Sequence, residues 1–382
     1  GGTPAGERGG GILVSNAVNF RIEDCIIKTN RVQGGYYSYS YGGGIYFHQS
    51  SGIISNSIIR ENQTRHTHID SVGGGHGGGI YIYGGNCQII RCMIRNNIAY
   101  TAGYGDARGG GVIFNSGTHK IQNSLIVSNE AYYKPGGGGG GIFAAANVEV
   151  INCTIVGNKN EGINRNSGTV TVTNSIIWGH VDDIFGSMGL YYCCISDGTD
   201  EGRNGCITNN PLFADSVYYH LKSQYGRYFD GYFGGGYWTN DTITSPLIDV
   251  CNPSRLPAFE PHPNGCIVNM GAYGNTPTAS KSHPLEVINH PPSGIGLSEA
   301  TFNGELLHMG SSNVHVRPSS LTDQLRASIG SICAVAGLKR VKPMKRFSTT
   351  SRVDRSKRRR NASAAATTKR GRSDAAPRRQ SA

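Results

Sequence analysis

The sequence predicts an all-β protein: a right-handed single-stranded parallel β-helix (solenoid) with a C-terminal cap and a disordered tail. A glycine-rich turn followed by a short apolar segment returns along the first half of the chain. A second landmark, which ends in Asn, keeps a nearly fixed distance from each turn. The 56 glycines among 382 residues lack the period of collagen, so they indicate repeated tight turns.

The first landmark is Gly-Gly-Gly followed by Ile or Val, with weaker copies at residues 162–163 and 183–184. Its first apolar residues are Ile12, Ile45, Ile80, Val112, Ile142, Ile163 and Ile184. They lie 21 to 35 residues apart, which is within the range of solenoid repeats. We therefore expect about seven short coils.

The second landmark is typified by Asn-Ser-x-Ile, and a polar residue follows three positions after its last apolar residue. These residues are Asn30, Asn62, Asn97, Asn129 and Asn158, with His180 in the sixth copy. In stacked coils they would lie about 4.8 Å apart and could form an amide ladder while Ile and Val stack inside. Unrelated hairpins would not hold Asn at a constant offset, whereas a flat β-sandwich stays open as an alternative.

One position of the second landmark carries small residues throughout. Cys25, Cys92 and Cys153 occupy the position that Ser57, Ser124 and Ser175 occupy in the other copies. Because free Cys is commonly buried, we interpret these cysteines as stacked core residues and predict no metal site there.

These coils resemble the pectate-lyase-like right-handed β-helix repeat proteins, especially large bacterial surface or secreted proteins. A second resemblance, to the terminal segment attached to such helices, is carried by Asn210-Pro211-Leu212-Phe213, Thr244-Ser245-Pro246-Leu247-Ile248-Asp249 and Asn269-Met270-Gly271-Ala272-Tyr273-Gly274. The resemblance implies that this segment closes the helix end and protects its open strand edge. Cys251 and Cys266 bracket a Pro-rich loop within it, where a disulfide or two thiols are both compatible with the sequence.

Four regions follow from these patterns: parallel β-helix coils at 1–205, a C-terminal cap region at 206–282, a linker or partial module at 283–317 and a disordered basic tail at 318–382. Residues 285–316 resemble the opening strands of a fibronectin-type-III-like module, but only about three of roughly seven strands are present. The Arg-, Ser- and Ala-rich stretch that follows is too poor in apolar residues to build a core.

The net charge of +11 belongs to the tail. From Arg326 onward there are 17 basic and two acidic residues, which leaves 19 basic and 23 acidic residues for the rest. We therefore expect no nucleic acid as a partner of the folded part. No run of 18 apolar residues is present, so we expect no membrane span. The chain begins with Gly1, which indicates a fragment whose signal peptide would lie upstream.

Longer excursions leave the predicted helix at one corner. The segments from the second landmark to the next glycine turn have 16 to 21 residues in the first four coils and 7 or 8 in the next two. Stacking would place the four long segments side by side as one wall or groove. Their aromatic residues suit the apolar faces of sugar rings, so the candidate ligand-binding residues are Tyr36, Tyr39, Tyr41, His76, Tyr100, Tyr104, Tyr132 and Tyr133. The alternative is that these tyrosines only pack the loops against the helix.

Catalysis would need acids or a base in the same place. The weak catalytic candidates are Asp70, Asp106 and Arg108; a lyase of the resembled family would in addition hold Ca²⁺, for which these are few acids. Neighbouring Asp182 and Asp183 should point to opposite faces of a strand, which favours a structural role. We expect no metal at His66, His68 and Asp70 and no cofactor.

The sequence therefore favours a monomeric, secreted or cell-surface β-helix module of a larger protein. We expect it to be non-catalytic and either to bind a polysaccharide or cell-surface glycan or to serve as an adhesin or stalk. The alternative is an enzyme, a polysaccharide lyase or glycoside hydrolase of the pectin-lyase-like fold.

Overall fold

The computed structural model describes residues 7–132, 138–229 and 235–284, and the backbone of three further strands at 286–293, 299–308 and 346–352. All regular elements in these residues are β-strands, and none of the described residues form a helix that could cross a membrane. By the density of its contacts the chain forms two units, of which the larger contains residues 1–284.

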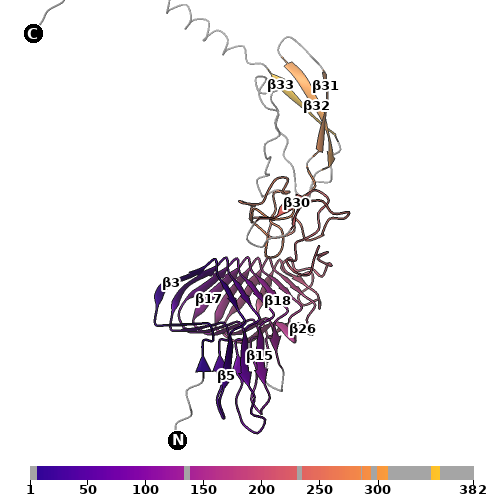
Figure 1. Ribbon diagram of the computed structural model, residues 1–382. Helices are drawn as coiled ribbons and strands as arrows, with labels where there is room; N and C mark the ends of the chain where they lie inside the picture. Colours follow the sequence, from indigo (N-terminus) through magenta and orange to yellow (C-terminus); the bar gives the residue numbers. More distant parts are fainter. Residues whose placement is uncertain are drawn as a thin grey trace, which may run out of the picture. The chain divides into compact units, whose positions relative to one another are not determined.

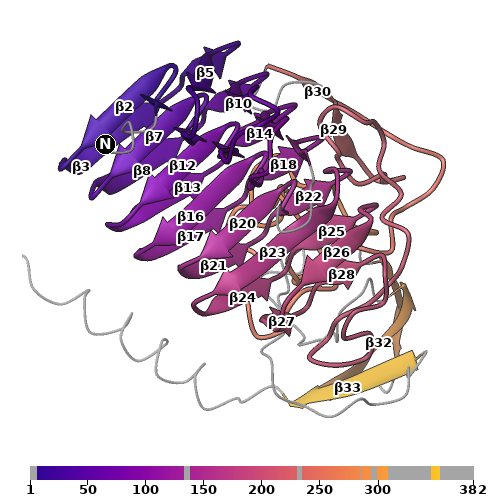
Figure 2. The same cartoon turned by 90° about the horizontal axis from the view of Figure 1, so that it is seen from below.

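Three parallel sheets of seven strands each form the walls of the solenoid (Figures 1 and 2). Sheet 1 contains β2 (Ile12–Ser15), β7 (Ile45–His48), β12 (Ile80–Tyr83), β16 (Val112–Ser116), β20 (Ile142–Ala145), β23 (Glu161–Ser167) and β26 (Asp182–Phe185). Sheet 2 contains β3 (Val18–Glu23), β8 (Ser51–Ser55), β13 (Cys87–Ile90), β17 (Thr118–Gln122), β21 (Asn147–Ile151), β24 (Val170–Thr173) and β27 (Gly189–Tyr191). Sheet 3 contains β4 (Ile26–Lys28), β9 (Ile58–Arg60), β14 (Met93–Arg95), β18 (Leu125–Val127), β22 (Thr154–Val156), β25 (Ile176–Trp178) and β28 (Cys194–Ile195). Each coil thus adds one strand to every wall, which confirms the predicted parallel β-helix and excludes the sandwich.

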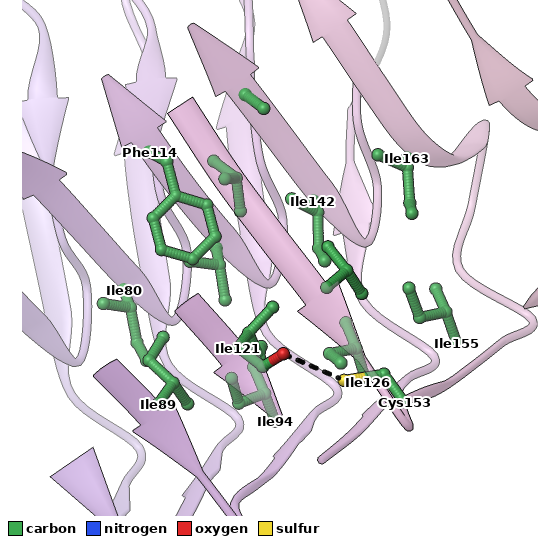
Figure 3. Packing of buried hydrophobic residues seen from close by; sticks show 14 of the residues in the cluster. Ile80, Ile89, Ile94, Phe114, Ile121, Ile126, Ile142, Cys153, Ile155 and Ile163 are labelled. Carbon is green, nitrogen blue, oxygen red and sulfur yellow. Dashed lines mark hydrogen bonds between the residues drawn. The ribbon is translucent and has the colours of Figure 1, made fainter. Parts of the chain in front are cut away.

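The core consists of inward-pointing aliphatic side chains that stack from coil to coil (Figure 3). Ile80 pairs in register with Val112 and Val112 with Ile142, and all three are fully buried. The same is true of Ile94, Ile126 and Ile155 in sheet 3. Burial on this scale contributes about 25 cal/mol per Å² of apolar surface and is the main source of stability.

The predicted Asn ladder forms. The Asn62 amide donates to Asn97 Oδ1 at 3.0 Å, the Asn97 amide donates to Asn129 Oδ1 at 2.9 Å, and the same bond links the other rungs from Asn30 to Asn158. Each Oδ1 also accepts the backbone N–H of the preceding rung's Asn. Since the corner buries these backbone groups, the ladder supplies partners that would otherwise be missing.

Each of the three glycines in a turn is favoured over larger residues for a different reason, as residues 77–79 illustrate. Gly77 has φ of +67°, a conformation that favours glycine. A Cβ on Gly78 would lie 2.5 Å from the carbonyl carbon of Ile98, and a Cβ on Gly79 would lie 3.1 Å from the Asn97 amide group. The Gly-Gly-Gly pattern therefore indicates a corner whose backbone lies close to both a neighbouring strand and the Asn ladder.

The Cys and Ser position also stacks as predicted. The Cys92 N–H donates to Ser124 Oγ at 3.1 Å, and the Cys153 N–H donates to Ser175 Oγ at 3.0 Å. The Cys153 thiol donates to backbone carbonyls, one of which is shown in Figure 3, and burial raises its pKa to about 12. Cys92 and Cys153 are therefore unreactive thiols of the core.

The excursions of the first coils form a β extension of two further parallel sheets, whose strands β5 and β15 project from the solenoid in Figure 1. Sheet 4 contains β5 (Arg31–Gly34), β10 (Gln63–His66), β15 (Ile98–Thr101) and β19 (Glu130–Ala131). Sheet 5 contains β1 (Glu7–Arg8), β6 (Ser40–Tyr41) and β11 (Gly75–His76). The expectation that these segments stack side by side is thus correct.

The cap region contacts the solenoid in two places. After the last coil, the Tyr192 N–H donates to Asn204 O at 2.9 Å, Cys194 and Ile207 form a parallel bridge, and Cys206 is buried in the core. The segment around Ala272 and Tyr273 packs on the outer face of sheet 3, where Asn123 Nδ2 donates to Ala272 O at 3.0 Å. The outward residues of sheet 3 there are Met93, Leu125, Val127 and Val156, which are apolar and need a cover.

The rest of the cap has little regular structure. β29 (Arg227–Phe229) and β30 (Tyr237–Thr239) pair antiparallel, and an Arg227–Asp241 ion pair lies beside them. Cys251 is buried as a free thiol, so the structure does not contain the Cys251–Cys266 disulfide.

The smaller unit contains one antiparallel sheet of β31 (Glu286–Ser293), β32 (Glu299–His308) and β33 (Arg346–Arg352). β31 and β32 lie within residues 285–316, where the sequence predicts opening strands, and residues 309–316 lie outside the described part of the chain. β33 lies within residues 318–382, the predicted basic tail. Its run of Ser and Thr between Phe347 and Arg352 is compatible with a strand, which gains its partner only from β32.

Candidate binding surface on the β extension

The β extension has two outer faces because its two sheets lie back to back. Ser40 Oγ donates to the carbonyl of Arg65 at 3.1 Å, and a Cβ on Gly75 would lie 2.7 Å from the carbonyl oxygen of Thr64. Ser40 and Gly75 of sheet 5 therefore point toward sheet 4. Since side chains alternate along a strand, their neighbours Tyr41 and His76 point outward.

The inner residues of sheet 4 are equally buried. Thr64, His66 and Thr101 are fully buried, and Thr101 Oγ1 donates to Gly73 O at 2.9 Å. His66 therefore belongs to the interior of the extension, where burial lowers its pKa. Arg65 and Tyr100, one residue away, point to the opposite outer face.

The sheet 5 face carries Tyr39, Tyr41 and His76. The His76 ring lies 4.9 Å from the Tyr39 ring and 5.6 Å from the Tyr41 ring, measured between centroids. Arg8, Tyr41, His76 and Arg108 follow one another in register across paired strands and bridges. Burial raises the pKa values of Tyr39 and Tyr41, so both phenols stay neutral.

Asp106 contacts two members of this row, His76 and Arg108. Its Oδ1 lies 3.2 Å from His76 Nε2, and its Oδ2 forms an ion pair with Arg108. Burial acts to raise the pKa of Asp106, but the hydrogen bond from His76 and the charges of His76 and Arg108 outweigh it and hold the pKa below its ordinary value. Arg108 also lies over the Phe143 ring at 5.1 Å. These groups are thus already engaged with one another.

The sheet 4 face carries Tyr100 and Tyr132 beside two cations. The two tyrosine rings lie 4.9 Å apart, Arg65 lies 5.0 Å from the Tyr100 ring, and Lys159 lies 5.7 Å from the Tyr132 ring. Tyr132 is 41% exposed. This face is therefore an aromatic row with a cation at each end, open to solvent at Tyr132.

The remaining tyrosines of the candidate set lie toward the tip of the extension. Tyr36 packs edge-on against Tyr37 and His68, and its hydroxyl lies 3.5 Å from Asp70 O. Tyr104 is 75% exposed. Tyr133 lies outside the described residues.

The structure separates the acidic candidates. Asp106 and Arg108 meet on the sheet 5 face, whereas Asp70 lies beside Tyr36 at the tip. In the part of the chain that the structure describes, no three His, Cys, Asp or Glu residues form a group that could hold a metal ion.

Asp182 and Asp183 point to opposite sides, as alternation predicts. Asp182 is exposed, and Asp183 is buried. Asp183 Oδ1 accepts from His180 Nδ1 at 2.7 Å, and Oδ2 accepts from Ser196 Oγ at 2.6 Å. Because His180 Nε2 accepts from the Asn158 amide, Asp183 fixes the tautomer of the residue that ends the ladder, which is a structural role.

The predicted site did not include Arg65 and Lys159 on the sheet 4 face, or Tyr46, Tyr81 and Phe143 on the outside of sheet 1. The latter are nearly buried and pack beside Tyr41. A signal for them exists, because Ile45-Tyr46-Phe47 and Ile142-Phe143-Ala144 lack the polar alternation of a strand with one wet face. Lys159 lies in one of the short segments between the second landmark and the next turn, and not in a long excursion, so no local pattern indicates it.

Comparison with known proteins identifies the fold family. Neither the curated proteins nor the solved structures contain a match to this chain. The family model described as "Right handed beta helix region" matches residues 10–226, more than half of the 382 residues, and this range contains the three solenoid walls and all strands of the extension except β1. The chain therefore belongs to the right-handed β-helix family.

Proposed function

We propose that this chain is a non-catalytic, extracellular or cell-surface β-helix module that binds a polysaccharide across the sheet 4 face of its extension. The observation that carries the proposal is the row formed by Arg65, Tyr100, Tyr132 and Lys159. The solenoid acts as the rigid support that keeps this row in register.

The chemistry of the row suits a glycan. Sugar rings present apolar C–H faces that pack on an aromatic plane, and their hydroxyl or carboxylate groups can reach neighbouring charged side chains. Gln33, Arg65 and Tyr100 lie on successive strands of sheet 4, so ligand groups meet a repeat of about 4.8 Å. Tyr132 is already exposed, and packing against Tyr100 orders its ring, which lowers the entropic cost of binding.

The test replaces Tyr100 and Tyr132 together with Ala and measures retention on an array of neutral and acidic polysaccharides. We expect at least a tenfold loss of affinity, about 1.4 kcal/mol, with an unchanged thermal unfolding midpoint. Tyr191→Ala is the matched control, because Tyr191 is 43% exposed on β27, away from the extension, and should bind like wild type. Unchanged retention by the double variant would contradict the proposal.

A second candidate function is polysaccharide cleavage at the sheet 5 face, favoured by the convergence of His76, Asp106 and Arg108. To separate the two, the chain is incubated with acidic and neutral polysaccharides, with and without Ca²⁺, while unsaturated products and reducing ends are followed. Cleavage that falls by a factor of about 10² to 10⁴ in Asp106→Ala would establish an enzyme. Binding without cleavage supports the non-catalytic module, and neither activity would leave a stalk.

A further inference from the structure

The stacked Cys and Ser position changes its pattern at the C-terminal end of the solenoid. From Cys25 to Ser175 every cysteine of the row is separated from the next by a serine. Cys193 continues the row, because its thiol donates to Val172 O and Tyr191 O as the Cys153 thiol does to Ile121 O and Ile151 O. The next rung is Cys206, so two cysteines follow each other there.

The backbone places these two residues directly opposite each other. Ile207 N donates to Cys193 O at 2.9 Å, and Cys194 and Ile207 form a parallel bridge. Paired strands lie about 4.8 Å apart, which falls within the 4.4 to 6.8 Å that disulfide Cα atoms span. The turn between them is held by bonds between Cys206 N and Arg203 O and between Gly202 N and Cys206 O.

The two thiols are buried together and differ in acidity. Cys193 is fully buried, and Cys206 is 1% exposed. The hydrogen bond from the Cys193 thiol lowers the pKa of Cys206, whereas burial raises the pKa of Cys193. Cys194 points the other way, and its thiol donates to Asn209 O at 3.1 Å, so it does not compete for Cys206.

We propose that Cys193 and Cys206 form a disulfide that cross-links the last full coil to its closing turn. The co-reactant is a small-molecule disulfide. The Cys206 thiolate attacks one of its sulfurs and releases a thiolate; the Cys193 thiolate then displaces the second and closes the protein S–S bond. Two protein thiols are oxidised, and the small-molecule disulfide is reduced to two thiols.

The cross-link closes a loop at the end of the cooperative stack, where fewer neighbours hold a coil in place. For a loop of this length the restriction of the unfolded chain should raise the thermal midpoint by about 5 to 10 °C. The other cysteines of the row cannot respond in the same way, because a serine lies on each adjacent rung. This disulfide does not depend on glycan binding by the sheet 4 face.

The test refolds the full chain from denaturant in a glutathione redox buffer, alkylates the remaining thiols and digests with trypsin. Cleavage after Arg203 places Cys193 and Cys206 on different peptides, so the link appears in mass spectrometry as a joined pair that is lighter by two hydrogens. Because Cys193 and Cys194 share one tryptic peptide, fragmentation of the joined pair between these two residues assigns the bond to one of them. We expect this pair, and a thermal midpoint that falls by about 5 to 10 °C on reduction.

Two variants sharpen the result. Cys206→Ser extends the natural alternation by one serine, and its thermal midpoint should not respond to reductant. Cys153→Ser, altered at a rung between two serines, should still form the link. Wild-type protein in which both thiols are alkylated after oxidative refolding would overturn the proposal, as would a link from Cys206 to Cys194; these readouts do not depend on either variant folding.

Discussion

The solenoid and the β extension share one backbone plan but differ in what fills them. Both are stacks of parallel strands in register, and both gain one strand from each of the early coils. The solenoid encloses rows of buried isoleucines such as Ile94 and Ile126. The extension encloses Ser40, Thr64 and Gly75, so its layers come almost into backbone contact. We infer that the solenoid carries the stability, while the extension is a thin plate that presents its outer side chains.

The later coils support this division. The coils that begin at β23 and β26 have no strand in sheet 4 or sheet 5, yet Ile163 and Ile177 are fully buried there. The solenoid can therefore form without the extension. The extension has no comparable apolar interior of its own.

The largest expected effect comes from breaking the ladder of the solenoid with Asn97→Ala. This change leaves the Asn62 backbone N–H and the Ile59 carbonyl without their partners inside the protein. At roughly 1 to 3 kcal/mol for each unmet group, we expect the free energy of unfolding to fall by about 3 to 5 kcal/mol in urea titrations. Lys120→Ala on the outer face of sheet 2 should change it by less than about 0.5 kcal/mol. Equal effects of the two changes would show that the ladder does not stabilise the fold.

A smaller effect is expected where the two regions meet, at Gly78→Ala. The added Cβ would lie 2.5 Å from the Ile98 carbonyl carbon, so the layers must separate, which we expect to cost about 2 kcal/mol or more. Gly157→Ala is the matched control: φ is +57° but nothing lies within 4 Å, so only backbone strain of about 1 kcal/mol applies. Thermal unfolding and limited proteolysis would measure both, with new cleavage near residues 66–76 only in Gly78→Ala. The reverse order would refute close layer packing.

The smallest effect should be confined to the extension, in Asp106→Asn. The pKa of Asp106 is lowered in the folded state, so its contribution to stability is present above the unfolded pKa near 3.8 and is lost as pH falls through the folded value. We expect a loss of about 1 kcal/mol at pH 7 that shrinks below about pH 4. Hydrogen exchange of residues 101–108 at pH 7 and at pH 3.5 would detect it. A difference that persists unchanged in acid would exclude the ionised carboxylate as its source.

The amino-acid sequence by itself determined the coils, their register and the ladder. These features follow from local patterns, since a corner that buries backbone groups admits few residues besides Asn and Gly, and the patterns repeat in every copy. It also predicted that the excursions lie side by side, because stacked coils leave them no other arrangement.

Only the tertiary structure decided where the excursion side chains point. Each excursion runs out on sheet 4 and back on sheet 5, so Tyr100 and His76 occupy opposite faces although both belong to the same predicted wall. Lys159 contacts Tyr132 from another coil, and Ala272 packs on sheet 3 although it lies far from that sheet's strands in the sequence. Such contacts depend on how layers pack across long sequence distances, which no local period encodes, whereas the repeat is encoded in every coil.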